Sequence, residues 1–474
     1  MICSHLNTEE DIYSASQVCN HWRSVLISSP PLWIQSPCRR VPRTIASLER
    51  CKSLPIRLML ASQSSIIALK KVLLRGNKVT SLAVHPYLHP MPLSHQLFTH
   101  SRPTVEQLHV FADRWRAEEP AAREIWQDFP CLRELFVCRY SIPIDHLVAP
   151  NLVHLALEQE GCNPTLKSTL NMLRACPLLE TILIVRSSGY ADQAHNHSPV
   201  SLPHLRSIEF GLHEVNSGLI THVQLPLNVA TSFRELFTSD ICGEITSSVM
   251  VSMQHVLRRV DIHCITLAAP PSPQQHVYLL VRFEGSGGSL EITIGIRPVQ
   301  LQDVLFGPGG VLFSHAPNIR NARELHIVGC SFEDDQGLDH VSAAMPNLVS
   351  ISLFDCRGTL GLLTPTDPSS LPFPHLERVM VLGPGLGLRE MVKARRDFCV
   401  SLKTLVIGRG PKGSWYDYLG DYPESALEEF VDNLHTEYPT EIVEWGADNE
   451  IANVWSAVEI PGLVSPNGNF LILG

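Results

Sequence analysis

The chain has 474 residues, of which 44% are hydrophobic, and a formal net charge of −10 at pH 7. The length exceeds that of one ordinary compact domain, and the hydrophobic content excludes an intrinsically disordered chain. The acidic balance argues against a protein that holds nucleic acid by neutralising phosphates, so we expect no nucleic-acid partner.

The sequence shows no signal for secretion or for membrane insertion. Residues 1–11 are too polar for a signal peptide, and no apolar run approaches the ~20 residues that a membrane helix needs. The 13 cysteines are odd in number and include no Cys-x-x-Cys pair, which favours reduced thiols over disulfides. We therefore expect a cytoplasmic or nuclear protein without membrane contact.

A helical segment is predicted between positions 8 and 33. Thr8 is a suitable N-cap, and the acidic residues after it suit the first turn of a helix. The apolar residues that follow recur at three- and four-residue spacing, which indicates an amphipathic helix with a break near Asn20. A double proline ends the helix before Leu32 and Trp33. One interpretation of this segment is a short helical cap on the domain that follows.

From position 79 onward, a pattern of apolar-x-x-apolar-x-apolar recurs, often with proline two residues before it. The pattern starts at Val79, Val105, Leu132, Leu152, Leu179, Leu205, Phe233, Leu257, Ala322, Leu348, Leu376 and Leu402. Most starts are about 24 to 28 residues apart, which is typical of a repeat protein. One longer gap indicates an irregular insert at about 265–315.

Each repeat is expected to contribute a strand and, in several cases, a helix. The final apolar-x-apolar pair has the two-residue period of a strand with one buried face. Helix-period residues precede several strands, as Leu166, Leu170 and Leu173 do before Pro177. Such units bury their apolar faces only against their neighbours, so they stack into a solenoid. Alternating Leu290, Ile292 and Ile294 within the insert support a strand, so we expect the insert either to fold over one face of the repeats or to form an extra hairpin around residues 277–296.

These repeats resemble leucine-rich repeats, and two of them match the cysteine-containing subclass. The two matches read Ala322-x-x-Leu325-x-Ile327-x-x-Cys330 and Leu348-x-x-Ile351-x-Leu353-x-x-Cys356. The resemblance implies an α/β fold, with a horseshoe solenoid over residues 46–425 and a C-terminal cap over 426–474. It also implies that the residue between the last two apolar positions faces a concave surface that binds a protein substrate. These residues are His109, Phe136, Ala156, Leu183, Glu209, Phe237, Asp261, His326, Ser352, Met380 and Val406.

Residues 2–33 resemble the second two-thirds of an F-box of the fungal type, and we expect the F-box-like segment to span residues 1–45. The resemblance is carried by Glu9, Glu10, Asp11, Val18, Cys19, Trp22, Arg23, Ser29, Pro30, Leu32 and Trp33. The Leu-Pro-x-Glu segment with which F-boxes begin is missing, so we expect either an incomplete gene model or a variant that binds the adaptor weakly or not at all. The resemblance implies that this segment binds the adaptor subunit of an SCF-type ubiquitin ligase, and through it a cullin. The expected contacts are Leu6, Ile12, Val18, Cys19, Trp22, Leu32 and Trp33.

Together the two resemblances imply a substrate-recognition subunit of a cullin–RING ubiquitin ligase, and not an enzyme. The alternative is a leucine-rich-repeat interaction scaffold without a ligase. A nucleotide-binding enzyme is a third reading, but residues 383–387 have the spacing Gly-x-Gly-x-Gly, which differs from a dinucleotide site. The histidine pairs His85/His89 and His195/His197 lack companions at metal-ligand spacing, so we predict no metal site and no cofactor.

Overall fold

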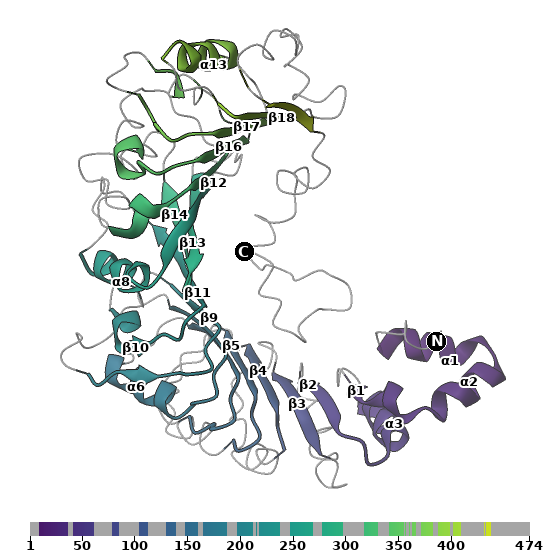
Figure 1. Ribbon diagram of the computed structural model, residues 1–474. Helices are drawn as coiled ribbons and strands as arrows, with labels where there is room; N and C mark the ends of the chain where they lie inside the picture. Colours follow the sequence, from purple (N-terminus) through teal and green to yellow (C-terminus); the bar gives the residue numbers. More distant parts are fainter. Residues whose placement is uncertain are drawn as a thin grey trace. The chain divides into compact units, whose positions relative to one another are not determined.

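Figure 1 shows the computed structural model of the chain. The structure describes residues 9–36, 41–60, 78–84, 104–111, 129–138, 147–159, 165–186, 197–211, 215, 218–237, 247–268, 277–296, 317–329, 341–354, 356, 360, 363–365, 371–382, 387–398, 402–408, 431 and 433–437. The chain divides between Pro226 and Leu227 into two compact units, which we call unit 1 and unit 2. Both are mixed α/β structures with few helices, and their described strands form open, mainly parallel sheets.

Unit 1 begins with short helices (Figure 1). Helix α1 (Glu9–Val18) is followed by α2 (Asn20–Ile27), the 3-10 helix η2 (Pro30–Trp33) and α3 (Val41–Cys51). Cys19 separates α1 from α2 because its backbone is extended, and its Sγ accepts a hydrogen bond from the Trp22 amide at 3.5 Å. The sequence predicts a break at this point. It does not predict α3.

A parallel sheet runs through unit 1, with strands paired in chain order. Its strands are β1 (Gln35–Ser36), β2 (Ile56–Leu60), β3 (Val79–Val84), β4 (Gln107–Phe111), β5 (Glu134–Cys138), β6 (His154–Gln159), β7 (Thr181–Arg186) and β9 (Ser207–Phe210). A separate pair joins β8 (Val200–Ser201) to β10 (Val223–Gln224). Strands β1 and β2 precede the first predicted repeat, so the sheet starts earlier than the sequence pattern indicates.

The core of unit 1 lies on one face of this sheet. Strand β5 buries Leu135 and Val137, the final apolar pair of its repeat, and neighbouring strands bury the equivalent positions. Helix α6 (Leu166–Arg174) buries Leu166, Leu170 and Leu173, which confirms the predicted helix. Its first turn is capped by Thr165, whose Oγ1 accepts a hydrogen bond from the Ser168 amide at 3.0 Å. A 3-10 helix, η4 (Leu219–His222), lies near the end of the unit.

Unit 2 is built on a sheet with the strand order β11, β14, β13, β12, β15, β16, β17, β18, β19. The bounds are β11 (Val229–Phe237), β12 (Asp261–Ala268), β13 (Val277–Ser286), β14 (Gly288–Ile296), β15 (Glu324–Val328), β16 (Ser350–Phe354), β17 (Arg378–Leu382), β18 (Thr404–Gly408) and β19 (Asn433–Glu437). Its helices are α8 (Ser247–Leu257), η6 (Pro317–Asn321) and α13 (Leu388–Asp397). From β15 to β19 each strand pairs in parallel with the next.

The hairpin β13–β14 is inserted into the sheet of unit 2. Of the two alternatives for the insert, the structure has the hairpin, with β13 antiparallel to β12 and β14 parallel to β11. Glycines form its tip because neighbouring backbone approaches closely. A Cβ on Gly288, whose φ is +128°, would lie 2.4 Å from the Val229 carbonyl oxygen. A Cβ on Gly285 would lie 2.0 Å from the Asp261 carbonyl oxygen.

The end of unit 2 contains a helix and a final strand in segments for which the sequence gives expectations. Helix α13 buries Leu388, Met391 and Val392, which recur at helical spacing ahead of the repeat that starts at Leu402, as expected for several repeats. Strand β19 and Val431 are the described part of the segment predicted as a cap, and β19 extends the sheet beside β18. Of the glycine-rich loop at 383–387, residues 383–386 lie outside the described residues.

Candidate functional site

The N-terminal helical segment (residues 9–33) is anchored by Trp33. Its side chain is 1% exposed, and its Nε1 donates a hydrogen bond to the Leu26 carbonyl oxygen at 2.8 Å. The Tyr13 ring meets it edge-on, with centroids 5.4 Å apart. The Arg50 guanidinium of α3 lies 4.2 Å from the Trp33 ring centroid, within cation–π range. Trp33 therefore ties α1, α2, η2 and α3 together.

This packing corrects part of the predicted adaptor contact. Ile12 and Trp33 are buried within the chain, so they support the segment and present no surface to a partner. The amphipathic pattern does not distinguish the residues that face the chain's own core from those that face a partner, because both are apolar. Leu6 lies outside the described residues.

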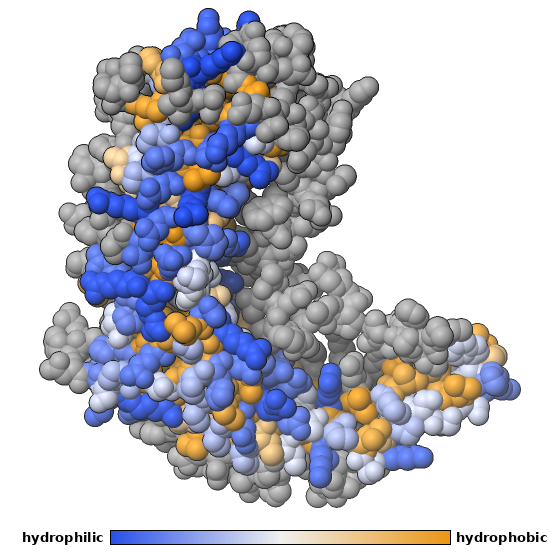
Figure 2. All heavy atoms as spheres, in the orientation of Figure 1, coloured by the Kyte–Doolittle hydropathy of each residue, from blue (hydrophilic) through white to orange (hydrophobic). Residues whose placement is uncertain are grey.

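The remaining predicted contacts reach the surface of the helical segment. Val18 is 70% exposed and Cys19 is also exposed, whereas Trp22 and Leu32 are half-buried. Val25 and Ile27 of α2 are exposed as well, although the sequence does not predict them as contacts. Figure 2 shows apolar surface, in orange, over these N-terminal helices. The segment thus presents apolar side chains to solvent on helices that pack around Trp33.

A second feature is a column of residues across the outer face of the unit 1 sheet, opposite its core. Strand register aligns Ala83, His109, Phe136, Ala156, Leu183 and Glu209, which we call the unit 1 column. In-register residues of parallel strands point to the same face, so these side chains are neighbours. Four of the predicted substrate contacts, His109, Phe136, Leu183 and Glu209, therefore lie together. His109 and Ala156 are buried, and the other four are half-buried.

A polar row flanks the unit 1 column two residues earlier in each strand. Its members are Ser81, Gln107, Glu134, His154, Thr181 and Ser207. Gln107 Nε2 donates to Glu134 Oε2 at 2.9 Å, and His154 Nδ1 lies 2.8 Å from Thr181 Oγ1. The outer face thus pairs a partly apolar column with a hydrogen-bonded polar margin.

His109 is the most perturbed group of the unit 1 column. It is 8% exposed, and its ring meets that of Phe136 edge-on at a centroid distance of 6.2 Å. Burial lowers the pKa of His109 from 6.5 to about 4, so the imidazole is neutral at physiological pH. Its buried Nε2 has no hydrogen-bond partner within the part of the chain that the structure describes.

The sheet of unit 2 carries a corresponding column, which corrects two predictions. Register aligns Thr266 with His326, and continues through Ser352, Met380 and Val406. His326 and Met380 are therefore placed as predicted on one face. Asp261 is not in this column, because the strand position in register with His326 is Thr266. The sequence pattern that starts at Leu257 has the required spacing, but Leu257 ends helix α8.

Phe237 is the second prediction that the register corrects. It pairs with Gly295 at the end of β11, whereas Ser232 of the same strand continues the column through Glu291 and Arg282. A register shift between Phe233 and Leu236 displaces the end of β11 from the regular repeat. A register irregularity of this kind has no sequence signature in the repeat pattern.

Comparison with protein-family models finds no match to this chain, and comparison with curated proteins finds no similar sequence. No helix in the described ranges is both long and apolar enough to cross a membrane. Two features of the described residues bear on function. The N-terminal helices expose apolar side chains, and the parallel sheets carry columns of in-register residues on the face opposite their core.

Proposed function

We propose that the chain is a substrate-recognition subunit of an SCF-type cullin–RING ubiquitin ligase. The helical segment would bind the adaptor subunit, which joins the chain to a cullin, and the strands of a leucine-rich-repeat solenoid would bind a protein substrate. The observation that carries the proposal is Val18, an apolar side chain that is 70% exposed on a segment packed around the buried Trp33.

The exposure of Val18, Val25 and Ile27 supports a protein partner for the helical segment. Fully burying a side chain such as valine contributes roughly 1.5–3 kcal/mol, so covering several of them stabilises a complex substantially. Val18 also belongs to the Val-Cys-x-x-Trp-Arg sequence, which resembles the same stretch of an F-box. Geometry and sequence therefore favour the same part of the segment.

The outer-face columns support a protein substrate. Phe136 and Leu183 offer half-buried apolar surface, and a polar row lies beside them. An apolar centre with a polar margin is typical of protein interfaces. The parallel strands β3 to β7, β9 and β15 to β18 bury the final apolar pair of their repeats, which favours leucine-rich repeats as their architecture.

Such a subunit needs no catalytic residue of its own. Holding a substrate and an adaptor on one chain raises the effective concentration of substrate lysines near the ligase's ubiquitin carrier. The rate of ubiquitin transfer then depends on how the chain positions the substrate and on its affinities for the substrate and for the adaptor.

A pull-down of the purified adaptor subunit by the full chain tests the proposal. The wild-type chain should retain the adaptor, and Val18→Asp should not, because a carboxylate would be desolvated in the interface. Val251→Asp is a matched control, since Val251 of α8 is a similarly exposed valine at 55% on a different unit. Retention by Val251→Asp shows that a new surface carboxylate alone does not prevent binding.

A repeat scaffold without ligase association is the second candidate. The burial of Ile12 and Trp33 favours it, because it reduces the apolar surface available for an adaptor. The outer-face columns serve a scaffold equally well. Failure of the wild-type chain to retain the adaptor, with its fold intact, would select this candidate.

A further inference from the structure

Strands β12 and β15 of unit 2 bring together a thiol, a carboxylate and an imidazole. Cys264 and Glu324 are in register, and His326 follows two residues along β15 on the same face. The Cys264 Sγ, a Glu324 carboxylate oxygen and a His326 ring nitrogen all lie within 4.8 Å of one another. Within the described ranges, no other group of three His, Cys, Asp or Glu residues converges in this way.

The donor set fits a borderline-soft divalent cation. Zn²⁺ binds cysteine sulfur at about 2.3 Å, histidine nitrogen at about 2.0–2.1 Å and carboxylate oxygen at about 2.0–2.2 Å. His326 Nε2 already lies 3.8 Å from Glu324 Oε2, close to the spacing of two ligands on one such ion. Five consecutive register pairs already hold the backbones of β12 and β15 side by side. Rotation of the side chains is therefore enough to bring the three ligand atoms to metal-binding distances.

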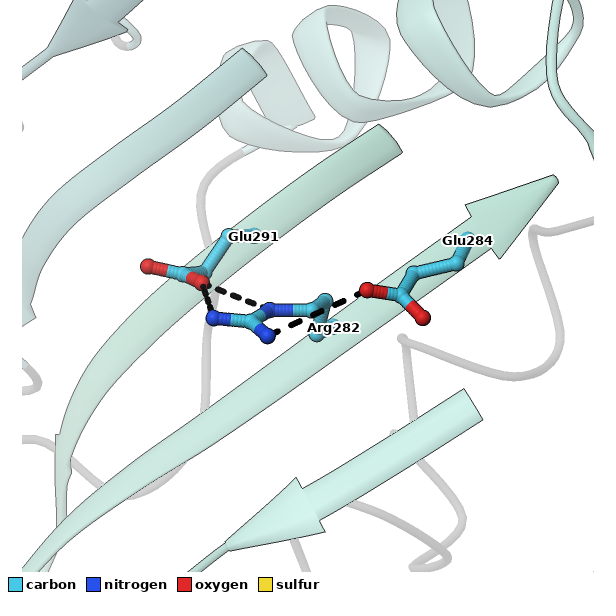
Figure 3. A network of polar contacts seen from close by, with 3 residues as sticks. All are labelled: Arg282, Glu284 and Glu291. Atoms are coloured by element: carbon cyan, nitrogen blue, oxygen red, sulfur yellow. Dashed lines mark hydrogen bonds and ion pairs between the residues drawn. The ribbon is translucent and has the colours of Figure 1, made fainter. Parts of the chain in front are cut away.

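The charges around these three residues also favour a cation. Glu284 of β13 is in register with Cys264 on one side, and Glu324 of β15 is in register with it on the other, so two carboxylates flank the thiol. The nearest guanidinium, that of Arg282, is held at 2.6 Å by Glu291 and at 3.8 Å by Glu284 (Figure 3). Two flanking carboxylates thus face one guanidinium that is itself paired, and a bound divalent cation would favour the thiolate by offsetting the carboxylate charge.

The site is also open to solvent on one side. Glu324 is exposed and His326 is half-buried, whereas Cys264 is buried. A metal ion can thus reach the thiol past the carboxylate and the imidazole. One coordination position would remain for water, as in zinc sites with three protein ligands.

We propose that Cys264, Glu324 and His326 form a binding site for Zn²⁺ or a cation of the same class. The bound ion would cross-link β12 to β15. These two strands are paired in the sheet but are separated in sequence by the hairpin β13–β14. This inference is independent of the proposed ligase function, because it rests on unit 2 alone.

Zinc titration of the full chain, stripped with a chelator and monitored against a chromophoric competitor, tests this site. Removing a group that only hydrogen-bonds to a metal ligand lowers metal affinity roughly 10–100-fold, so removing a ligand itself, in Cys264→Ser or His326→Gln, should weaken the tightest site by at least about 100-fold. Magnesium should not compete, because it requires oxygen ligands in octahedral geometry.

The matched control is Cys138→Ser. Cys138 Sγ lies 3.3 Å from Glu158 Oε2, so it repeats the thiol–carboxylate pair in unit 1 and lies outside the group of three. It should bind zinc as the wild-type chain does. Substituting Co²⁺ gives a second readout, a thiolate-to-cobalt charge-transfer band that Cys138→Ser retains and Cys264→Ser loses. Equal affinities in the wild-type chain and both site variants, or a wild-type cobalt spectrum without that band, would overturn the proposal.

Discussion

His109 and Phe136 occupy in-register positions of β4 and β5, and their rings meet edge-on with planes at 76°. The contact places a neutral imidazole in the partly apolar column that we propose for substrate binding. Because the pKa of His109 is lowered to about 4, the unfolded chain binds a proton there at pH values where the folded chain does not.

The stability of the chain should therefore depend on pH through His109. Its contribution is fully present above the unfolded pKa of 6.5 and is lost as the pH falls toward 4, by at most about 3 kcal/mol. Chemical denaturation of His109→Gln at pH 7 and pH 4.5 should show a smaller loss of unfolding free energy than the wild type. His204→Gln, at an exposed histidine, should keep the wild-type difference. Equal pH dependence in all three proteins would contradict a buried, neutral His109.

The hairpin tip in unit 2 should not tolerate a side chain. Gly288→Ala forces a Cβ within 2.4 Å of the Val229 carbonyl oxygen at a φ of +128°, so we expect a loss of about 3 kcal/mol or more. Gly387 also has a positive φ, +87°, but a Cβ there meets nothing within 4 Å. Gly387→Ala should therefore lose only about 1 kcal/mol from backbone strain. Thermal denaturation of both variants measures the difference, and equal losses would refute the steric account.

Arg395 of α13 should stabilise unit 2 despite its charge. It is fully buried, and its Nη1 and Nη2 each donate a hydrogen bond of 2.9 Å, to the carbonyl oxygens of Pro372 and Phe373 respectively. Burial lowers its pKa to about 10, so it stays protonated at pH 7. Arg395→Ala removes the guanidinium donor from both carbonyls, of which, among the described residues, only that of Phe373 keeps a second donor, the Leu376 amide at 3.0 Å. It also opens a cavity, so we expect the unfolding free energy to fall by about 3 kcal/mol.

Lys393→Ala on the same helix is the control for Arg395→Ala. Lys393 is exposed, so its removal should change the unfolding free energy by no more than about 0.5 kcal/mol. Urea denaturation of the two variants distinguishes them. A similar, small effect of both substitutions would mean that the guanidinium does not hold the 372–373 backbone in place.

The buried and exposed positions of a strand could be predicted from the sequence where apolar and other residues alternate regularly. Leu135 and Val137 are buried as predicted, because a two-residue period leaves one choice of buried face. The same rule failed at Asp261, since Leu257-x-x-Val260-x-Ile262 satisfies the spacing although Leu257 belongs to a helix. Local spacing does not reveal where a helix ends and a strand begins.

The candidate metal site could not be predicted, because its ligands come from different strands. Cys264 and His326 are separated by the whole hairpin insert, and only the pairing of β12 with β15 makes them neighbours. The burial of Ile12 and Trp33 could not be predicted either, because apolar residues have the same spacing whether they face the chain's own core or a partner.

The affinity of the full chain for the purified adaptor subunit tests the central claim most directly. We expect binding by the wild-type chain, unchanged binding by Val251→Asp, and a loss of at least about 30-fold, or about 2 kcal/mol, in Val18→Asp. Circular dichroism would establish that the three proteins are equally folded. If the adaptor does not bind the wild-type chain, or binds Val18→Asp as tightly, the helical segment is not an adaptor-binding surface.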